Sequence, residues 1–207
     1  LLSKMTAYER GEEQPHQPVL YQLSLDSLQP HSAGRYVDAT LGAGGHAFGI
    51  LERSAPSGQL LGLDVDDHAI SIARERLSQF QNRMTLKRCS YVFIERCLQT
   101  EGWTGADGIL FDLGVSSMQL DISERGFSFL RDGPLDMRFD THQPGKAADL
   151  INHASEEDLA EIIWKYGEER QSQKIAHAIC AERPIQGTLH FAQVIASALG
   201  GKRSNQH

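Results

Sequence analysis

The sequence predicts an α/β protein with a doubly wound, mostly parallel sheet and an inserted helical module. Three observations carry this prediction. Between Arg35 and Asp112, short apolar runs alternate with helical patterns, which is typical of a sheet covered by helices on both faces. A glycine-rich loop follows the first apolar run, where Rossmann-like folds turn from strand to helix. After Asp112 the alternation stops, and helical patterns dominate from Ser155 onwards.

The first half of the chain supplies four strands and four helices in order. We expect strands at 35–38, 60–64, 84–87 and 107–112, each bounded by polar or turn-forming residues. Helices are expected at 19–28, from the glycine loop through Arg53, from Asp66 onwards, and around 93–99. Asp66 can cap its helix, because Ile70, Ala73 and Leu77 then share one face.

The second half changes character. Residues 113–147 are rich in Gly, Ser and Asp and are expected to be irregular. Ser155 begins a helix-start signature, and further helices are expected at 169–182 and 188–199. We therefore divide the chain into a flexible arm at 1–15, a core domain at 16–144 and a helical insert at 145–207.

Composition excludes several classes of protein. The 207 residues are 40% hydrophobic and 23% charged, which argues against wholesale disorder, and the formal charge of −7 excludes a generally basic nucleic-acid coat. No apolar run reaches the ~18 residues of a membrane span, and the polar start lacks the apolar core of a signal peptide. Cys89, Cys97 and Cys180 lack metal-ligand spacing and indicate reduced thiols in a cytoplasmic protein.

The glycine loop indicates a nucleotide-type site. The run from Asp38 to His46 follows a strand, and Asp64 ends the next strand, where a carboxylate can accept hydrogen bonds from both hydroxyls of a ribose. A nicotinamide enzyme stays open, because Gly42, Gly44 and Ala47 satisfy the Gly/Ala form of the dinucleotide fingerprint. Asp38 favours S-adenosylmethionine instead, since a carboxylate there repels a pyrophosphate but suits a sulfonium.

A second polar segment leaves the carboxyl end of the fourth strand, where ligands bind in doubly wound sheets. Asp112 is placed to bond an adenine amine or a substrate, and Ser116, Ser117 and Gln119 add further polar groups.

At these residues the chain resembles the MraW/RsmH family, whose members are S-adenosylmethionine-dependent methyltransferases acting on cytosine N4 of bacterial 16S ribosomal RNA. The resemblance runs from about Pro15 to His207. It rests on the segments 38–46, 112–121, 124–138 and 166–170, of which Glu124–Arg138 is the most specific. It implies the Rossmann-like methyltransferase fold for 16–144 and a substrate-recognition role for the helical insert. The family continues for about a further third, so its remaining core strands are expected outside this chain.

The resemblance also implies roles for individual residues. Cofactor contacts fall on Gly44, Gly45, His46, Asp64, Tyr91, Asp112 and Gln119, and Asp38 joins them by its charge. Tyr91 follows the third strand, where it can stack on an adenine. Hydrogen-bond acceptors for the reacting amine are Asp112, Ser116 and Ser117. No metal is expected, because a sulfonium methyl is already activated.

The implied substrate is 16S ribosomal RNA within the small ribosomal subunit. Residues 121–140 interleave basic and aromatic side chains, which can contact phosphates and stack on bases. The candidates are Arg125, Phe127, Phe129, Arg131 and Arg138. The alternative is a loop that packs its own aromatic residues and pairs its own charges.

At the level of the whole protein, two alternatives to the methyltransferase stay open: a nicotinamide-dependent oxidoreductase and a truncated, non-catalytic protein that binds cofactor or RNA. No membrane partner is expected. A homodimer is compatible with the sequence, which does not decide the oligomeric state.

Overall fold

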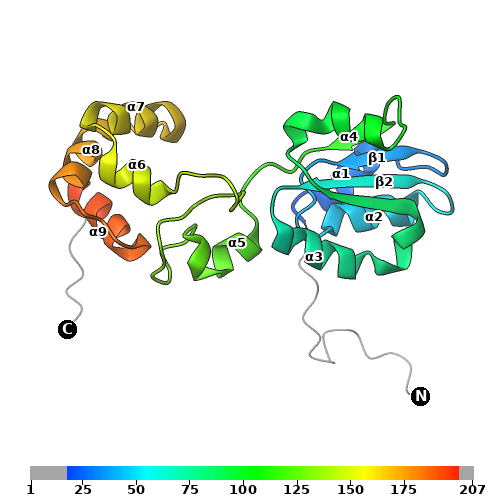
Figure 1. Ribbon diagram of the computed structural model, residues 1–207, viewed down its shortest axis with the longest axis horizontal. Coiled ribbons are helices and arrows are strands. Elements are labelled where there is room, and N and C mark those ends of the chain that lie inside the picture. The colour runs from blue at the N-terminus through cyan, green and yellow to red at the C-terminus, as the bar shows by residue number, and fades with distance from the viewer. Residues whose placement is uncertain (1–17, 201–207) are drawn as a thin grey trace, which may run out of the picture. The chain divides into compact units, whose positions relative to one another are not determined.

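The computed structural model describes residues 18–200, which form two compact units joined at Leu113–Gly114 (Figure 1). The expected flexible arm at 1–15 lies outside the described residues. Within 18–200, no helix combines the length and the apolar character needed to cross a membrane.

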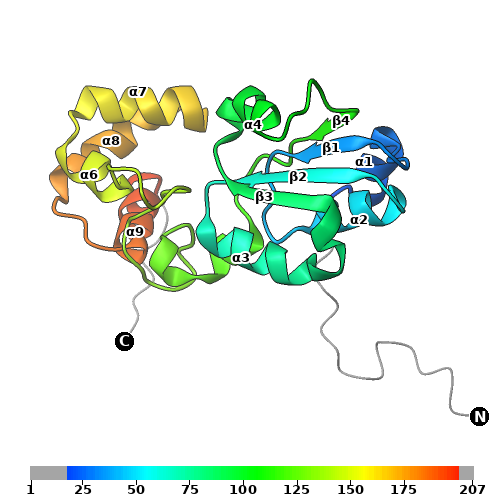
Figure 2. The ribbon, with the colours of Figure 1, turned by 45° about the vertical axis from the view of Figure 1, so that its right-hand side comes forward.

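The first unit is built on a parallel sheet with the strand order β3-β2-β1-β4 (Figure 2). This order matches the first four positions of the doubly wound Rossmann arrangement, so the predicted fold class is confirmed. Every neighbouring pair of strands is parallel. The strands are β1 (Arg35–Asp38), β2 (Gln59–Asp64), β3 (Met84–Arg88) and β4 (Gly108–Leu110).

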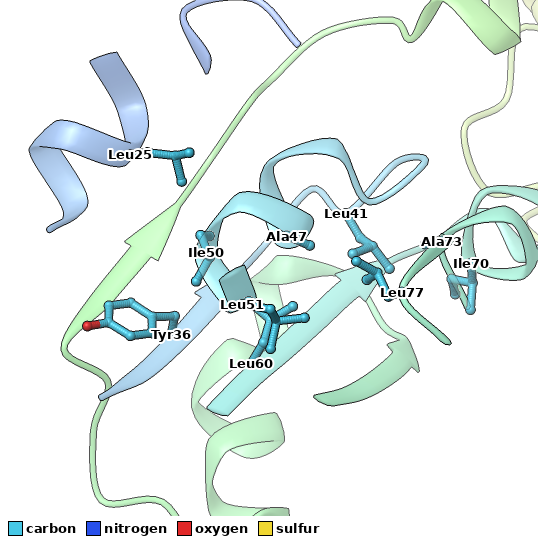
Figure 3. Packing of buried hydrophobic residues seen from close by; sticks show 10 residues of the cluster. All are labelled: Leu25, Tyr36, Leu41, Ala47, Ile50, Leu51, Leu60, Ile70, Ala73 and Leu77. Atoms are coloured by element: carbon cyan, nitrogen blue, oxygen red, sulfur yellow. The ribbon is translucent and has the colours of Figure 1, made fainter. Parts of the chain in front are cut away.

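Helices cover both faces of this sheet. Neighbouring residues in a strand point to opposite sides, so buried apolar residues in succession require cover on each side. Tyr36 of β1 belongs to the buried apolar cluster on the face of the sheet covered by α1, α2 and α3, whose side chains the close view of the core shows (Figure 3). Its neighbour Val37 packs on the opposite face against Cys97 and Trp103. The helical segments of this unit are α1 (Tyr21–Leu28), α2 (Gly45–Arg53), α3 (Asp67–Arg76), η2 (Ser78–Arg83), η3 (Tyr91–Phe93) and α4 (Ile94–Thr100).

The second unit is helical. Leu135, Ile151, Ile175 and Ile179 are among the residues of its own buried apolar cluster. Ser155 caps α7 by accepting a hydrogen bond from the backbone N–H of Asp158, as predicted. The helices are α5 (Ser117–Asp121), η4 (Ser123–Arg125), α6 (Ala147–His153), α7 (Glu156–Gly167), α8 (Ser172–Ala181) and α9 (Thr188–Ala198).

The segment 114–146 belongs to the helical unit, whereas the sequence division groups residues up to 144 with the sheet. Leu135 is 2% exposed inside the helical core, and its carbonyl accepts a hydrogen bond from the N–H of Ala148. The N–H of Thr188 likewise donates to the carbonyl of Gly133 at 3.0 Å. These hydrogen bonds attach the segment to the starts of α6 and α9. They join residues far apart in the sequence, so no local sequence pattern predicts them.

Candidate functional site

The candidate residues of the first unit follow the carboxyl ends of its strands. Asp38 ends β1, Asp64 ends β2, Tyr91 follows β3 and Asp112 follows β4. Because all four strands are parallel, these ends share one edge of the sheet, which is where doubly wound proteins bind ligands.

The glycine loop is fastened to Asp64. The N–H of Gly42 donates to Oδ2 of Asp64 at 2.8 Å, and the N–H of Asp66 donates to Oδ1 at 2.9 Å. Gly42 has φ 51°, a left-handed conformation that glycine adopts without steric cost. Two backbone donors therefore orient the Asp64 carboxylate, which keeps lone pairs for two further hydrogen bonds.

The next two glycines serve the packing of the protein itself. Gly44 has φ 75°, and a Cβ there would lie 3.2 Å from the Cβ of Ala73 on α3. A Cβ on Gly45 would overlap Pro18. Close approach of α2 to its neighbours thus explains both glycines without reference to a ligand.

Asp38 is buried, with 1% of its surface exposed, and it binds backbone groups at both ends of the glycine loop. Its carboxylate accepts hydrogen bonds from the backbone N–H groups of Thr40 and Ala47. The pKa of Asp38 is raised to about 7, chiefly by burial and in addition by the charges of Asp64 and Asp112, while the hydrogen bonds from the Thr40 and Ala47 N–H groups lower it. Within 18–200, no lysine or arginine forms an ion pair with any of these three carboxylates.

His46 and Asp112 face each other at the start of α2. Nε2 of His46 lies 3.6 Å from Oδ2 of Asp112, and the His46 ring stacks on Tyr21 at 5.8 Å. Burial lowers the pKa of His46, although the Asp112 charge opposes this. Nδ1 of His46 is buried without a hydrogen-bond partner. Asp112 is itself half exposed, which leaves its carboxylate reachable by a ligand.

Two residues that sequence reasoning missed shape this site. Thr40 accepts a hydrogen bond from the N–H of Asp112 at 2.7 Å and so ties the end of β1 to the end of β4. The Phe111 ring meets Tyr91 edge-on at 5.7 Å, and both rings are more than 40% exposed. The contact joins the segments that follow β3 and β4, which are the two outermost strands of the sheet, so it depends on the path of these segments and not on strand pairing. The only available signal was the strand period, which puts Phe111 on the same face as Ile109.

The remaining polar candidates of the motif lie in the second unit and cap α5. The N–H of Gln119 donates to Oγ of Ser116 at 3.2 Å, and the N–H of Ser116 donates to Oε1 of Gln119 at 3.1 Å. This reciprocal capping box satisfies two backbone donors and accounts for the burial of Gln119. Ser117 is exposed at the first position of the helix.

Two of the candidate arginines build the loop that carries them. Arg138 binds both carboxylate oxygens of Asp136, at 2.7 and 2.8 Å, and also donates to the carbonyls of Thr141 and Gln143. The Arg138 ion pair lowers the pKa of Asp136. Arg125 donates to the carbonyls of Arg138 and of its neighbour Phe139.

The aromatic candidates divide in the same way. Phe127 packs on Phe139 at 5.1 Å between ring centroids. In contrast, Phe129 is 64% exposed, Leu130 is 87% exposed and Arg131 is exposed as well. The loop thus presents the tip 129–131 to solvent and uses Arg125, Phe127 and Arg138 to hold its own shape.

The sheet edge of the first unit suits a ligand with a ribose, an aromatic ring and a positive charge. Asp64 offers paired acceptors, Tyr91 offers an exposed aromatic face, and three carboxylates that form no ion pair with a lysine or arginine of residues 18–200 favour a cation. The same carboxylates disfavour a pyrophosphate, because like charges repel at short range.

Comparison with known proteins assigns the chain to a family. Proteins named ribosomal RNA small subunit methyltransferase H match it at 47% identity in Dehalococcoides mccartyi and 48% in Syntrophus aciditrophicus, over 94% and 92% of this chain. The chain spans 56% and 62% of the length of these relatives. A solved rRNA methylase from Streptococcus thermophilus is 20% identical, with a TM-score of 0.34 over 41% of this chain and 50% of that one. The sequence model of the MraW methylase family matches residues 13–207, and the chain belongs to that family.

Proposed function

We propose that the chain is the cofactor-binding portion of an S-adenosylmethionine-dependent methyltransferase that methylates N4 of a cytosine in 16S ribosomal RNA of the small subunit, in the cytoplasm. The observation that carries the proposal is the set of three carboxylates at the sheet edge, Asp38, Asp64 and Asp112, without a lysine or arginine paired to them in residues 18–200. Membership of the MraW methylase family supports the same reading.

In this proposal, each site residue interacts with a different part of the cofactor. Asp64 is oriented by the Gly42 and Asp66 N–H groups, and its free lone pairs accept the two ribose hydroxyls. Tyr91 stacks on the adenine, and Phe111 holds the Tyr91 ring from its edge. Asp38 stabilises the positive charge through the field of its buried carboxylate rather than by contact, because its surface is covered.

When bound, S-adenosylmethionine supplies a methyl group activated by its sulfonium. The cytosine amine is a poor nucleophile, because its lone pair is delocalised into the ring. Asp112 is half exposed and accepts a hydrogen bond from that amine, which holds the nitrogen in line and favours its rehybridisation. Ser116 and Ser117 follow Asp112 in the same motif and serve as further acceptors in this proposal.

The exposed tip at Phe129, Leu130 and Arg131 is the proposed RNA contact of the second unit. An exposed aromatic ring next to an arginine can stack on a splayed base while the guanidinium binds a phosphate. The RNA target is therefore a single-stranded or flipped cytosine.

Calorimetric titration with S-adenosylmethionine tests the cofactor assignment. We expect Asp64→Ala to weaken binding by roughly 10- to 100-fold, because two charge-assisted hydrogen bonds to the ribose are lost. Asp26→Asn is the charge-matched control, since Asp26 of α1 pairs with Arg53 of α2 and none of its described contacts is with a site residue. Binding of NADH in preference to S-adenosylmethionine would instead identify a nicotinamide enzyme.

The reaction is tested with small ribosomal subunits and free 16S RNA as parallel substrates. Nucleoside mass spectrometry after incubation with labelled cofactor is expected to yield N4-methylcytidine. A methyl group on C5 or on another base would contradict the proposed specificity. Cofactor binding without methyl transfer to either substrate would support a non-catalytic binding protein.

A further inference from the structure

Two cysteine thiols meet at the turn that carries Tyr91 of the candidate site. Cys89 directly follows β3, and Cys97 lies in α4. The Cys97 thiol donates to Sγ of Cys89, with a separation of 3.0 Å between the two sulfur atoms. A disulfide bond requires about 2.04 Å, so closure needs a movement of about 1 Å.

The two thiols differ in their surroundings. Cys97 is 6% exposed and belongs to the apolar cluster between the sheet and α4. Burial, followed by the hydrogen bond to Cys89, raises the pKa of Cys97 to about 11. Cys89 is only partly buried. Cys89 is therefore the thiol that a reagent in solution meets first, and Cys97 is the neighbour held ready behind it.

The pair is also connected to the proposed cofactor residues. The N–H of Cys89 donates to the backbone carbonyl of Asp64 at 2.8 Å, which continues the ladder between β2 and β3. Tyr91 lies between the two cysteines in sequence, in the turn η3 that leads into α4. A covalent bond between Cys89 and Cys97 would close a ring around this turn.

We propose that Cys89 and Cys97 form an oxidation site, a dithiol that a low-molecular-weight disulfide such as oxidised glutathione converts reversibly into an intramolecular disulfide. The Cys89 thiolate attacks one sulfur of the reagent and expels one thiolate, which leaves a mixed disulfide on Cys89. Cys97 then gives its proton to that thiolate, and its sulfur attacks Sγ of Cys89 and expels the second thiolate, which takes up the proton released by Cys89. Two protein thiols are oxidised, and one reagent disulfide is reduced to two thiols.

Closing this disulfide adjusts the cofactor site, a consequence that rests on the proposed function. The movement of about 1 Å draws the first turn of α4 and the Tyr91 turn towards the end of β3. Displacement of the Tyr91 ring is expected to weaken S-adenosylmethionine binding by roughly tenfold, because the ring proposed to stack on the adenine loses part of its contact. Reduction restores the original spacing and the original affinity.

The test treats the whole chain with oxidised glutathione and then alkylates the remaining thiols. Cys180 lies in α8 of the other unit and provides an internal control, because none of its described contacts is with a second cysteine sulfur. We expect a mass loss of two hydrogens, one alkylated cysteine at position 180, and a peptide joining positions 89 and 97. A stable glutathione adduct on Cys89, or equal alkylation of all three cysteines, would overturn the proposal.

Two variants separate the disulfide from its effect on the site. In Cys97→Ala, the glutathione adduct on Cys89 should persist, because the resolving thiol is absent. In Cys89→Ala, no oxidation at Cys97 is expected. Calorimetry then compares S-adenosylmethionine affinity in the oxidised and reduced chain, and equal affinities would overturn the regulatory consequence. If neither form binds the cofactor while the disulfide still forms, the proposed function fails and the oxidation site stands.

Discussion

Asp38 couples the uptake of a proton to the folding of the first unit. Its carboxylate is covered, accepts two backbone hydrogen bonds and lies near the charges of Asp64 and Asp112. At sequence level the charge of Asp38 was apparent from its place before the glycine loop. Its burial was not, because it depends on how α2 packs over the end of β1. Thr40 and Phe111 escaped prediction for a related reason, since Thr40 contacts the segment after β4 and Phe111 contacts the segment after β3, both far away in the sequence.

Replacing Asp38 with Asn should flatten the pH dependence of stability. The pKa of Asp38 is about 7 when folded and about 3.9 when unfolded, so the folded state retains a proton that the unfolded state releases. The resulting stabilisation is complete below pH ~4 and is lost as the pH rises to about 7. Asn carries no such proton. The free energy of unfolding of Asp38→Asn should therefore change less between these pH values than that of the unmodified chain, and the two changes should differ by roughly 1 to 4 kcal/mol.

Urea denaturation followed by circular dichroism between pH ~4 and ~8 measures this effect. Asp26→Asn is the control, because the Arg53 hydrogen bond lowers the pKa of Asp26 and takes its titration below the window. An unchanged slope in Asp38→Asn would show that the carboxyl titrates at its ordinary value in the folded chain.

Most elements were predicted from local patterns, and the exceptions share a physical cause. All four strands and α3, α4, α7, α8 and α9 fall at the expected positions, with ends shifted by a few residues. The segments α5 and α6 have five and seven residues; α5 lies in the stretch that was expected to be irregular, and no element was predicted for the residues of α6. They are too short for an apolar period to show. α5 is fixed by its capping box, and backbone bonds to Leu135 and Asp136 fix the start of α6.

The loop at 121–146 contains arginines of two kinds: Arg138 is bonded within the loop, and Arg131 is exposed. Replacing the first should affect stability, and replacing the second should affect RNA binding. Arg138→Ala should lower the free energy of unfolding by more than Arg131→Ala does, because it removes a bidentate ion pair and two carbonyl contacts. Arg131→Ala should leave stability within about 0.5 kcal/mol, because the side chain is exposed. It should weaken RNA binding at low salt by roughly twofold to tenfold, as the loss of one phosphate contact does.

Chemical denaturation and RNA binding measured on the same two variants decide between these roles. The interpretation fails if Arg138→Ala keeps full stability and Arg131→Ala keeps full RNA affinity. Salt dependence adds a second criterion, since loss of a phosphate contact reduces the slope of affinity against salt.

At the scale of the molecule, the chain is two units with separate apolar cores. The sequence predicted that a helical module follows the sheet, but not that the change falls at Leu113–Gly114. The contacts that draw 114–146 to the helices join positions far apart in the chain. In residues 18–200, β4 pairs only with β1, and Ile109 of β4 and Phe111 directly after β4 are more than 40% exposed. The further core strands expected from the family would pair with the side of β4 that does not face β1.

The chain has two tryptophans, and one lies in each unit. Trp103 is 9% exposed and packs in the core beneath α4, whereas Trp164 on α7 is 56% exposed. Because indole emission shifts to the red in water, Trp103→Phe and Trp164→Phe give two chains whose intrinsic fluorescence reports one unit each. Trp164→Phe retains the buried Trp103, so unfolding of the sheet unit should move its emission strongly to the red. Trp103→Phe retains the exposed Trp164, so unfolding of the helical unit should cause a smaller shift. Midpoints that differ between the variants would show that the units melt independently, and a shared midpoint would show one cooperative transition.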